Sequence, residues 1–222
     1  MKSKEIVKNI RAIYEKYAVP LNVQRHMREV AGVAAEICAN SKEKIDPTDL
    51  IAVCLVHDLG NICKINLVDE QKINLFDEED QKKLDFFRKK QKEFWNKYGK
   101  DDNKANELIA KELELNEKVI FLLENKAIEH KPKEFWANNF ELMVLAYSDC
   151  RVAPEGVVSM QQRIEEYAKR NLFHLDKEKA ERSKKFEEFA KQLEKEIFSK
   201  LQIKPQDITK ESVKKYIKEF GL

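Results

Sequence analysis

Two histidines and two aspartates on three separate segments are the residues best suited to chemistry: His26, the adjacent pair His57 and Asp58, and Asp149. In each segment apolar residues recur three and four positions away, which is the spacing of one face of an α-helix. We therefore expect His26, His57 and Asp149 to point toward the interior, with Asp58 one step of about 100° around its helix end from His57. A buried carboxylate without a partner costs several kcal/mol, so it must be paired, hydrogen-bonded or bound to a metal.

A single inward histidine is more often satisfied by a neighbouring core residue than bound to a metal. Three helices that each direct an ionisable residue inward favour a shared site. Two imidazoles and two carboxylates would satisfy one another poorly without a cation between them. A divalent metal resolves this conflict, and a buried polar network without metal is the alternative.

The elements that carry these residues are predicted to be helical throughout, because apolar residues recur at helical spacing and only five Gly and five Pro interrupt the chain. No strand is predicted. Helices are expected over residues 3–17, 22–40, 47–58, 78–98, 103–114, 116–129, 134–150, 158–171 and 177–201, with a short one after Thr209. The predicted fold class is all-α.

Composition narrows the classes of function. The 222 residues contain 42 Lys and Arg against 40 Asp and Glu, so the net charge of +2 gives no general affinity for nucleic acid or anionic membranes. No apolar run approaches the ~20 residues of a membrane span. Four cysteines without a C-x-x-C pair favour a reduced, cytoplasmic location.

The order of these residues resembles the HD-domain metal-dependent phosphohydrolases, which are all-helical proteins. The segments that carry the resemblance, over roughly residues 5–171, are RHMREVAGVAAEIC, AVCLVHDLGN and AYSDCRVAPEGVVSMQQRIEEYAKR. They are similar to the family's first-histidine helix, its His-Asp doublet and the ending around its last aspartate. The resemblance implies an HD-domain helical bundle with His26, His57, Asp58 and Asp149 as metal ligands.

The chain departs from the family pattern at several positions. Many members carry a lysine where this chain has Asn61, and that lysine can meet a phosphate. Two-metal members add two further histidines, whereas the corresponding regions here contain no histidine in the first case and Asn125, with His130 just beyond, in the second. One ion is therefore expected. Two nitrogens and two carboxylates suit Mn, Fe, Co, Ni or Zn better than Ca or Mg.

The resemblance implies hydrolysis of a phosphoester or phosphoanhydride, in a nucleotide or another small phosphate compound, by water that the ion activates. Asp58 would act in catalysis as a ligand of that ion. Positive charge on the phosphate oxygens is expected first from Arg151, then from Arg25 and Lys64. For Arg151 the alternative is an exposed helix-end residue that contacts terminal carbonyl groups.

Two rival functions stay open at this point. One is a metal-containing module that binds or senses a nucleotide without turnover, favoured by Asn61 and by the lack of an obvious general base. The other is a purely structural helical protein. Chelation and metal analysis distinguish these interpretations.

Two segments are expected as additions to the core of residues 1–175. The first is an insertion at about 64–104, whose lysine-rich helix carries an aromatic stripe. We expect this stripe to pack on the core in preference to forming a cationic lid or a nucleic-acid contact. The second is a C-terminal extension over 176–222, expected to pack on the core or on the partner in a homodimer.

Overall fold

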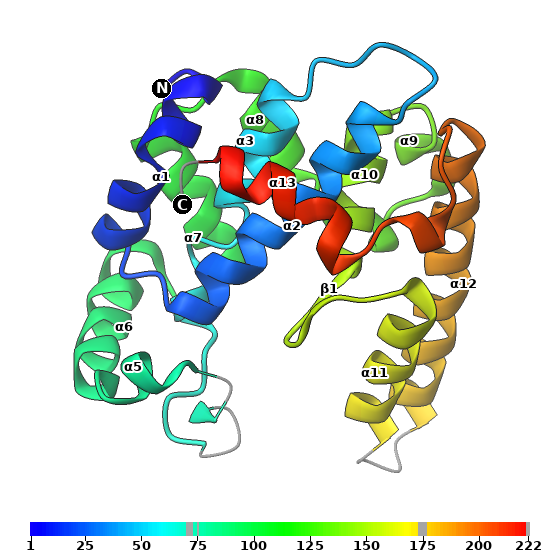
Figure 1. The fold of residues 1–222 in the computed structure, drawn as a ribbon. Coiled ribbons are helices and arrows are strands. Elements are labelled where there is room, and N and C mark those ends of the chain that lie inside the picture. The colour runs from blue at the N-terminus through cyan, green and yellow to red at the C-terminus, as the bar shows by residue number, and fades with distance from the viewer. Residues whose placement is uncertain (70–72, 75, 173–176, 221–222) are drawn as a thin grey trace.

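The three- and four-residue spacing of apolar side chains gives a mostly helical chain in the computed structural model, which describes residues 1–69, 73, 74, 76–172 and 177–220 (Figure 1). The predicted all-α class is confirmed. The helices are α1 (Ser3–Lys16), α2 (Leu21–Ala39), α3 (Thr48–Val56), α5 (Glu78–Gln81), α6 (Leu84–Tyr98), α7 (Asp102–Glu112), α8 (Glu117–Glu124), α9 (Lys133–Trp136), α10 (Phe140–Cys150), α11 (Met160–Leu172), α12 (Lys177–Ser199) and α13 (Lys210–Glu219). Among the described residues, no helix is both long and apolar enough to cross a membrane.

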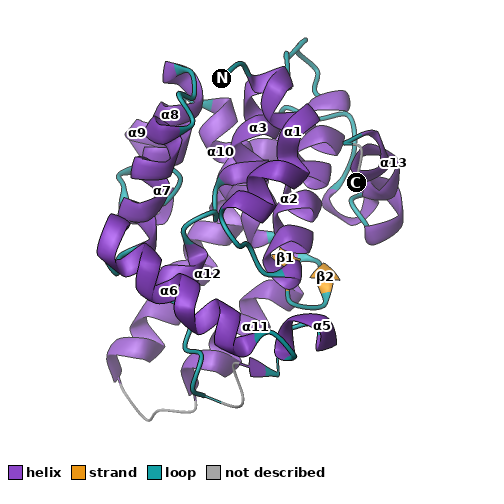
Figure 2. Cartoon of the chain, turned by 90° about the vertical axis from the view of Figure 1, so that its left-hand side faces the viewer, coloured by secondary structure: helices purple, strands orange, loops and turns teal. Residues whose placement is uncertain are grey.

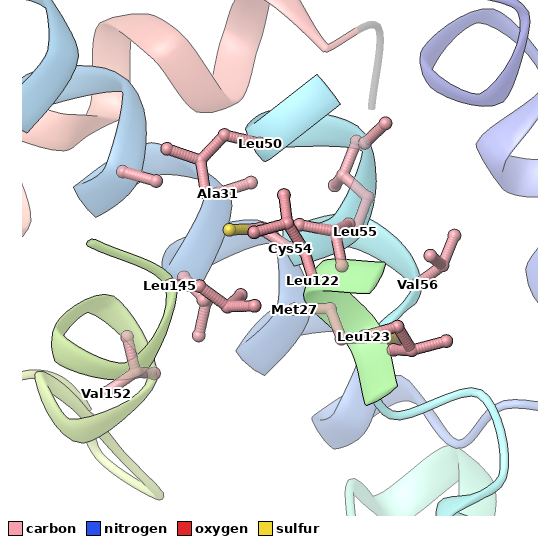
Figure 3. Packing of buried hydrophobic residues seen from close by; sticks show 14 of the residues in the cluster. Met27, Ala31, Leu50, Cys54, Leu55, Val56, Leu122, Leu123, Leu145 and Val152 are labelled. Atoms are coloured by element: carbon pink, nitrogen blue, oxygen red, sulfur yellow. The ribbon is translucent and has the colours of Figure 1, made fainter. Parts of the chain in front are cut away.

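The core lies between α2 and α3, which pack against each other and are surrounded by α1, α8 and α10. Ala31 of α2 and Leu50 of α3 are fully buried, and Figure 3 shows them among apolar side chains that include Leu122 and Leu145. Burying a leucine side chain in this way stabilises the fold by roughly 1.5 to 3 kcal/mol. This packing sets the first turns of α2 beside the C-terminal end of α3.

Two helices predicted as continuous are each broken in the structure. The helix predicted over 78–98 is divided into α5 and α6, and the helix predicted over 134–150 is divided into α9 and α10. The second break has a local cause, because the Asn139 side chain accepts the backbone N–H of Leu142 at 3.0 Å and so caps a new helix. Apolar spacing alone does not reveal such a break.

The prediction of no strand is wrong at one place, where a short hairpin follows α10 (Figure 2). Strands β1 (Val152–Ala153) and β2 (Gly156–Val157) pair antiparallel around a turn that contains Pro154. Gly156 has a φ of 114°, a backbone conformation that favours glycine. Strands of two residues are too short to show the alternating pattern by which strands are recognised.

The insertion packs on the core through the apolar face of α6. Phe87, Phe94 and Tyr98 are buried, and the Trp95 indole N–H donates to the Cys63 carbonyl at 2.9 Å. The buried Gln91 amide donates to the Ile62 carbonyl at 2.7 Å. These contacts orient the aromatic stripe toward the protein interior.

Glu112 of α7 ties the insertion to the N-terminal helix and gives a testable pH dependence. Its carboxylate accepts from Lys97 and Tyr98, each at 2.7 Å, and lies 3.0 Å from Lys16. The Lys97 bond, followed by the Tyr98 bond, lowers the pKa of Glu112 from its ordinary 4.5 to about 2. Because the folded state has the lower pKa, the stabilisation is present above pH 4.5 and is lost as the pH falls toward 2.

We therefore expect Glu112→Gln to lower the free energy of unfolding by about 1 kcal/mol at neutral pH, a modest value because the side chain is partly solvated. The difference between variant and wild type should shrink as the pH falls from 5 toward 2. Urea denaturation at several pH values measures this difference. A stability gap that stays constant across that range would contradict the pairing.

The C-terminal helices cover two sides of the core. Helices α11 and α12 lie side by side, α12 packs against α10, and α13 crosses α2 (Figure 1). A methyl group added at Gly32 of α2 would lie 3.0 Å from Ile217 and 3.2 Å from Val213, so glycine permits the close approach of α13. The predicted start of the extension at residue 176 lies outside the described residues. The homodimer stays a prediction.

Candidate metal centre

His26, His57 and Asp58 meet where the first turns of α2 lie beside the end of α3. One ligand atom from each residue lies within 4.8 Å of the others, and the two imidazole centroids are 5.3 Å apart. The predicted helix over 47–58 included His57 and Asp58, but α3 ends at Val56, so both residues lie in the turn after it. These three residues could hold a metal ion.

Asp149, in the last turn of α10, reaches the same place. Its Oδ1 atom lies 3.0 Å from Nε2 of His26 and 3.5 Å from Nε2 of His57. The structure therefore brings all four residues predicted as ligands into one cluster.

The hydrogen bonding of His57 prepares it to bind a metal. Its Nδ1 atom lies 2.7 Å from the carbonyl oxygen of Cys54. A carbonyl oxygen only accepts, so Nδ1 carries the proton, and in the neutral ring Nε2 presents a lone pair. This Nε2 is buried and has no hydrogen-bond partner among the described residues. A buried nitrogen held in this way fits a metal ligand oriented by a carbonyl behind it.

The two carboxylates stay ionised. Desolvation raises the pKa of Asp149, but the hydrogen bond with His26 and then the nearby His57 ring, whose Nε2 is 3.5 Å away, lower it further, to well below its ordinary value. Desolvation likewise raises the pKa of Asp58, and the charge of Lys126 is the main cause of its net lowering. The two carboxylates thus carry two negative charges, which would balance the two positive charges of a divalent ion.

His26 forms a hydrogen bond with Asp149 through its Nε2 atom. Desolvation lowers its pKa, but the hydrogen bond and charge of Asp149 outweigh this effect, so the net shift is upward. Nε2 of His26 would have to release its proton before it could bind a metal, because only the unprotonated nitrogen has a lone pair.

The carboxylate of Asp58 is bonded by two residues, Lys126 and Asn61. Neither was predicted from the sequence as a site residue. Nζ of Lys126 lies 3.0 Å from Asp58 Oδ1 and donates to the His57 carbonyl at 2.7 Å. The amide of Asn61 donates to Asp58 Oδ2 at 3.0 Å. Both carboxylate oxygens are therefore fixed. Lys126 follows α8, 68 positions from Asp58, so no local spacing pattern could have identified it.

Two predicted phosphate contacts, Arg25 and Lys64, pair with other carboxylates. Arg25 Nη1 lies 3.1 Å from both oxygens of Asp77. Lys64 donates to Asp102 at 2.6 Å. Desolvation lowers the pKa of Lys64, but the charge of Asp58 and then the bond to Asp102 raise it overall.

Arg151 lies in a different environment from the one predicted. It is only 2% exposed. Its guanidinium donates to four oxygens, namely the carbonyls of Val158, Pro205 and Ile208 and the hydroxyl of Tyr147. All three guanidinium nitrogens are engaged, so we do not retain Arg151 as a phosphate contact. The alternative prediction, that Arg151 contacts carbonyl groups, agrees better with the structure. It differs in two respects, because these carbonyls lie beyond the helix that Arg151 follows and because the side chain is buried.

His130, which lies just beyond Asn125, is on the surface. Its side chain is 81% exposed, and Nε2 is 3.6 Å from Glu129. It does not join the cluster in this structure.

No protein-family model, no curated protein and no solved structure matches the chain.

Proposed function

We propose that the protein is a cytoplasmic, metal-dependent phosphohydrolase of the HD-domain type. Its substrate would be a nucleotide or another small compound with a phosphoester or phosphoanhydride bond. The observation that carries this proposal is the meeting of His26, His57, Asp58 and Asp149, with the buried Nε2 of His57 left without a hydrogen-bond partner in the described part of the chain.

The donor set fits one ion of the group Mn, Fe, Co, Ni and Zn, because it combines imidazole nitrogens with carboxylate oxygens. When bound, such an ion would supply Lewis acidity to a phosphate oxygen and lower the pKa of water. The protein's contribution is to hold the donors in place. Cys54 orients His57 through its carbonyl, and Lys126 and Asn61 fix the carboxylate of Asp58.

The proposal is tested by reconstituting metal-depleted protein with each of the five metals and offering nucleoside mono-, di- and triphosphates. Phosphate release and the remaining product are both identified. We expect turnover only with added metal, and none in His26→Ala, whose partly exposed position limits the effect on folding. Inactivity with all substrates and metals would contradict the proposal. Nucleotide-induced thermal stabilisation without turnover would favour the binding module.

A further inference from the structure

We propose that Lys126 is the residue that contacts the anionic phosphate group of the substrate beside the metal centre. This inference rests on the proposed function and names a residue that the motifs did not supply. Lys126 lies directly after Asn125, the C-cap residue of α8, and only 17% of its side chain is exposed. It bonds Oδ1 of Asp58, whereas Asn61 bonds Oδ2 of the same carboxylate.

The number of donors on the ammonium group supports this role. An ammonium has three N–H donors. Two of them are directed at Asp58 Oδ1, 3.0 Å away, and at the His57 carbonyl, 2.7 Å away. The third donor has no bond to a described residue, and the partial exposure of the side chain gives it access to a ligand. A phosphate oxygen is a suitable acceptor for it.

Charge balance points the same way. Without an ion, Lys126 compensates the negative charge of Asp58. With a divalent ion in the cluster, Asp58 and Asp149 compensate the two charges of the metal, and the charge of Lys126 is left without a compensating group. A partly buried cation in that state attracts an anion. Metal binding should therefore raise the affinity of the site for phosphate, and Lys126 should be responsible for much of that affinity.

The three cations predicted for this role from the sequence have different partners. Arg25 is bound by Asp77 and Lys64 by Asp102, whereas Arg151 is enclosed by oxygen acceptors in the core. Among these four cations, Lys126 is the one whose side chain directly contacts a predicted metal ligand, Asp58.

The experiment measures two affinities in each variant, one for Mn²⁺ and one for inorganic phosphate in the Mn²⁺-loaded protein. Lys126→Met should bind Mn²⁺ at least as tightly as wild type, because a positive charge beside the ion is removed. Its phosphate affinity should fall roughly 10- to 100-fold, the value of a hydrogen bond to a charged group. Lys126→Arg keeps the charge and should lose less.

The matched control is Lys131→Met, because Lys131 is also partly buried but donates to the amide oxygen of Asn125 and lies over the Phe135 ring. It should leave both affinities unchanged. Circular dichroism establishes that each variant is folded.

Each other outcome overturns a defined part of the account. Wild-type phosphate affinity in Lys126→Met would overturn the anion contact and leave the proposed function intact. Loss of Mn²⁺ binding in Lys126→Met, recovered in Lys126→Arg, would show that Lys126 only positions Asp58. Wild-type protein that binds Mn²⁺ but gives no metal-dependent phosphate binding would overturn the inference alone. Wild-type protein that binds neither would overturn both.

Discussion

Asp58→Ala is expected to lose divalent-metal binding and phosphate-ester hydrolysis together. The substitution removes one of the four clustered donors and half of the carboxylate charge that compensates the ion. The loss of metal affinity should exceed the roughly 10- to 100-fold typical of residues that only support ligands. Metal content after equilibrium dialysis, measured beside activity, shows whether the two fall together.

The same substitution has a second consequence, which follows from Lys126. Removing Asp58 leaves the half-buried ammonium without its counter-charge, so the metal-free variant should lose about 1 to 3 kcal/mol of stability. The double variant Asp58→Ala with Lys126→Met should recover part of this stability but none of the metal binding. Normal metal loading in Asp58→Ala would show that Asp58 is an ion-pair partner and not a ligand.

Arg151→Met should reduce stability more than Glu112→Gln or Asp58→Ala. Three carbonyls and the Tyr147 hydroxyl lose their donor, and the segment that includes Pro205 and Ile208 loses its link to α10. We expect the free energy of unfolding to fall by about 3 to 5 kcal/mol, because several buried acceptors lose their donor at once and each such loss costs about 1 to 3 kcal/mol. Urea denaturation measures the change.

Arg25→Met is the matched control, since it removes an arginine whose ion pair with Asp77 is partly exposed, and it should cost at most about 1 kcal/mol. A second measurement on Arg151→Met tests the role first predicted for it. Under conditions where this variant is still folded, we expect it to bind phosphate with wild-type affinity. If Arg151→Met instead kept normal stability and selectively lost phosphate affinity, Arg151 would be the phosphate contact first predicted.

The sequence was sufficient to predict the helical class and the inward direction of His57, whereas His26 and Asp149 reach the same cluster with 24% and 46% of their side chains exposed. Helical periodicity is a local property, and a row of apolar residues fixes the direction of every side chain in that row. Their meeting in space was inferred from chemistry and from the resemblance. The structure agrees, because α2, α3 and α10 pack together and bring the three rows to one place.

The role of Lys126 and the burial of Arg151 could not be predicted in this way. Each depends on contacts between residues far apart in the chain, 68 positions for Lys126 with Asp58 and 57 for Arg151 with Ile208. No spacing pattern links such residues. The hairpin after α10 and the cap at Asn139 were missed because each is a very short feature within a strongly helical chain.

His26, His57, Asp58 and Asp149 are proposed to form one binding site for a divalent ion. The most direct measurement is a calorimetric titration of metal-free protein with Mn²⁺, Co²⁺, Ni²⁺ and Zn²⁺, with bound metal then quantified. We expect one ion per chain and marked weakening in Asp149→Ala. Protein that binds no stoichiometric metal, and whose melting temperature is unchanged by chelators, would contradict the claim.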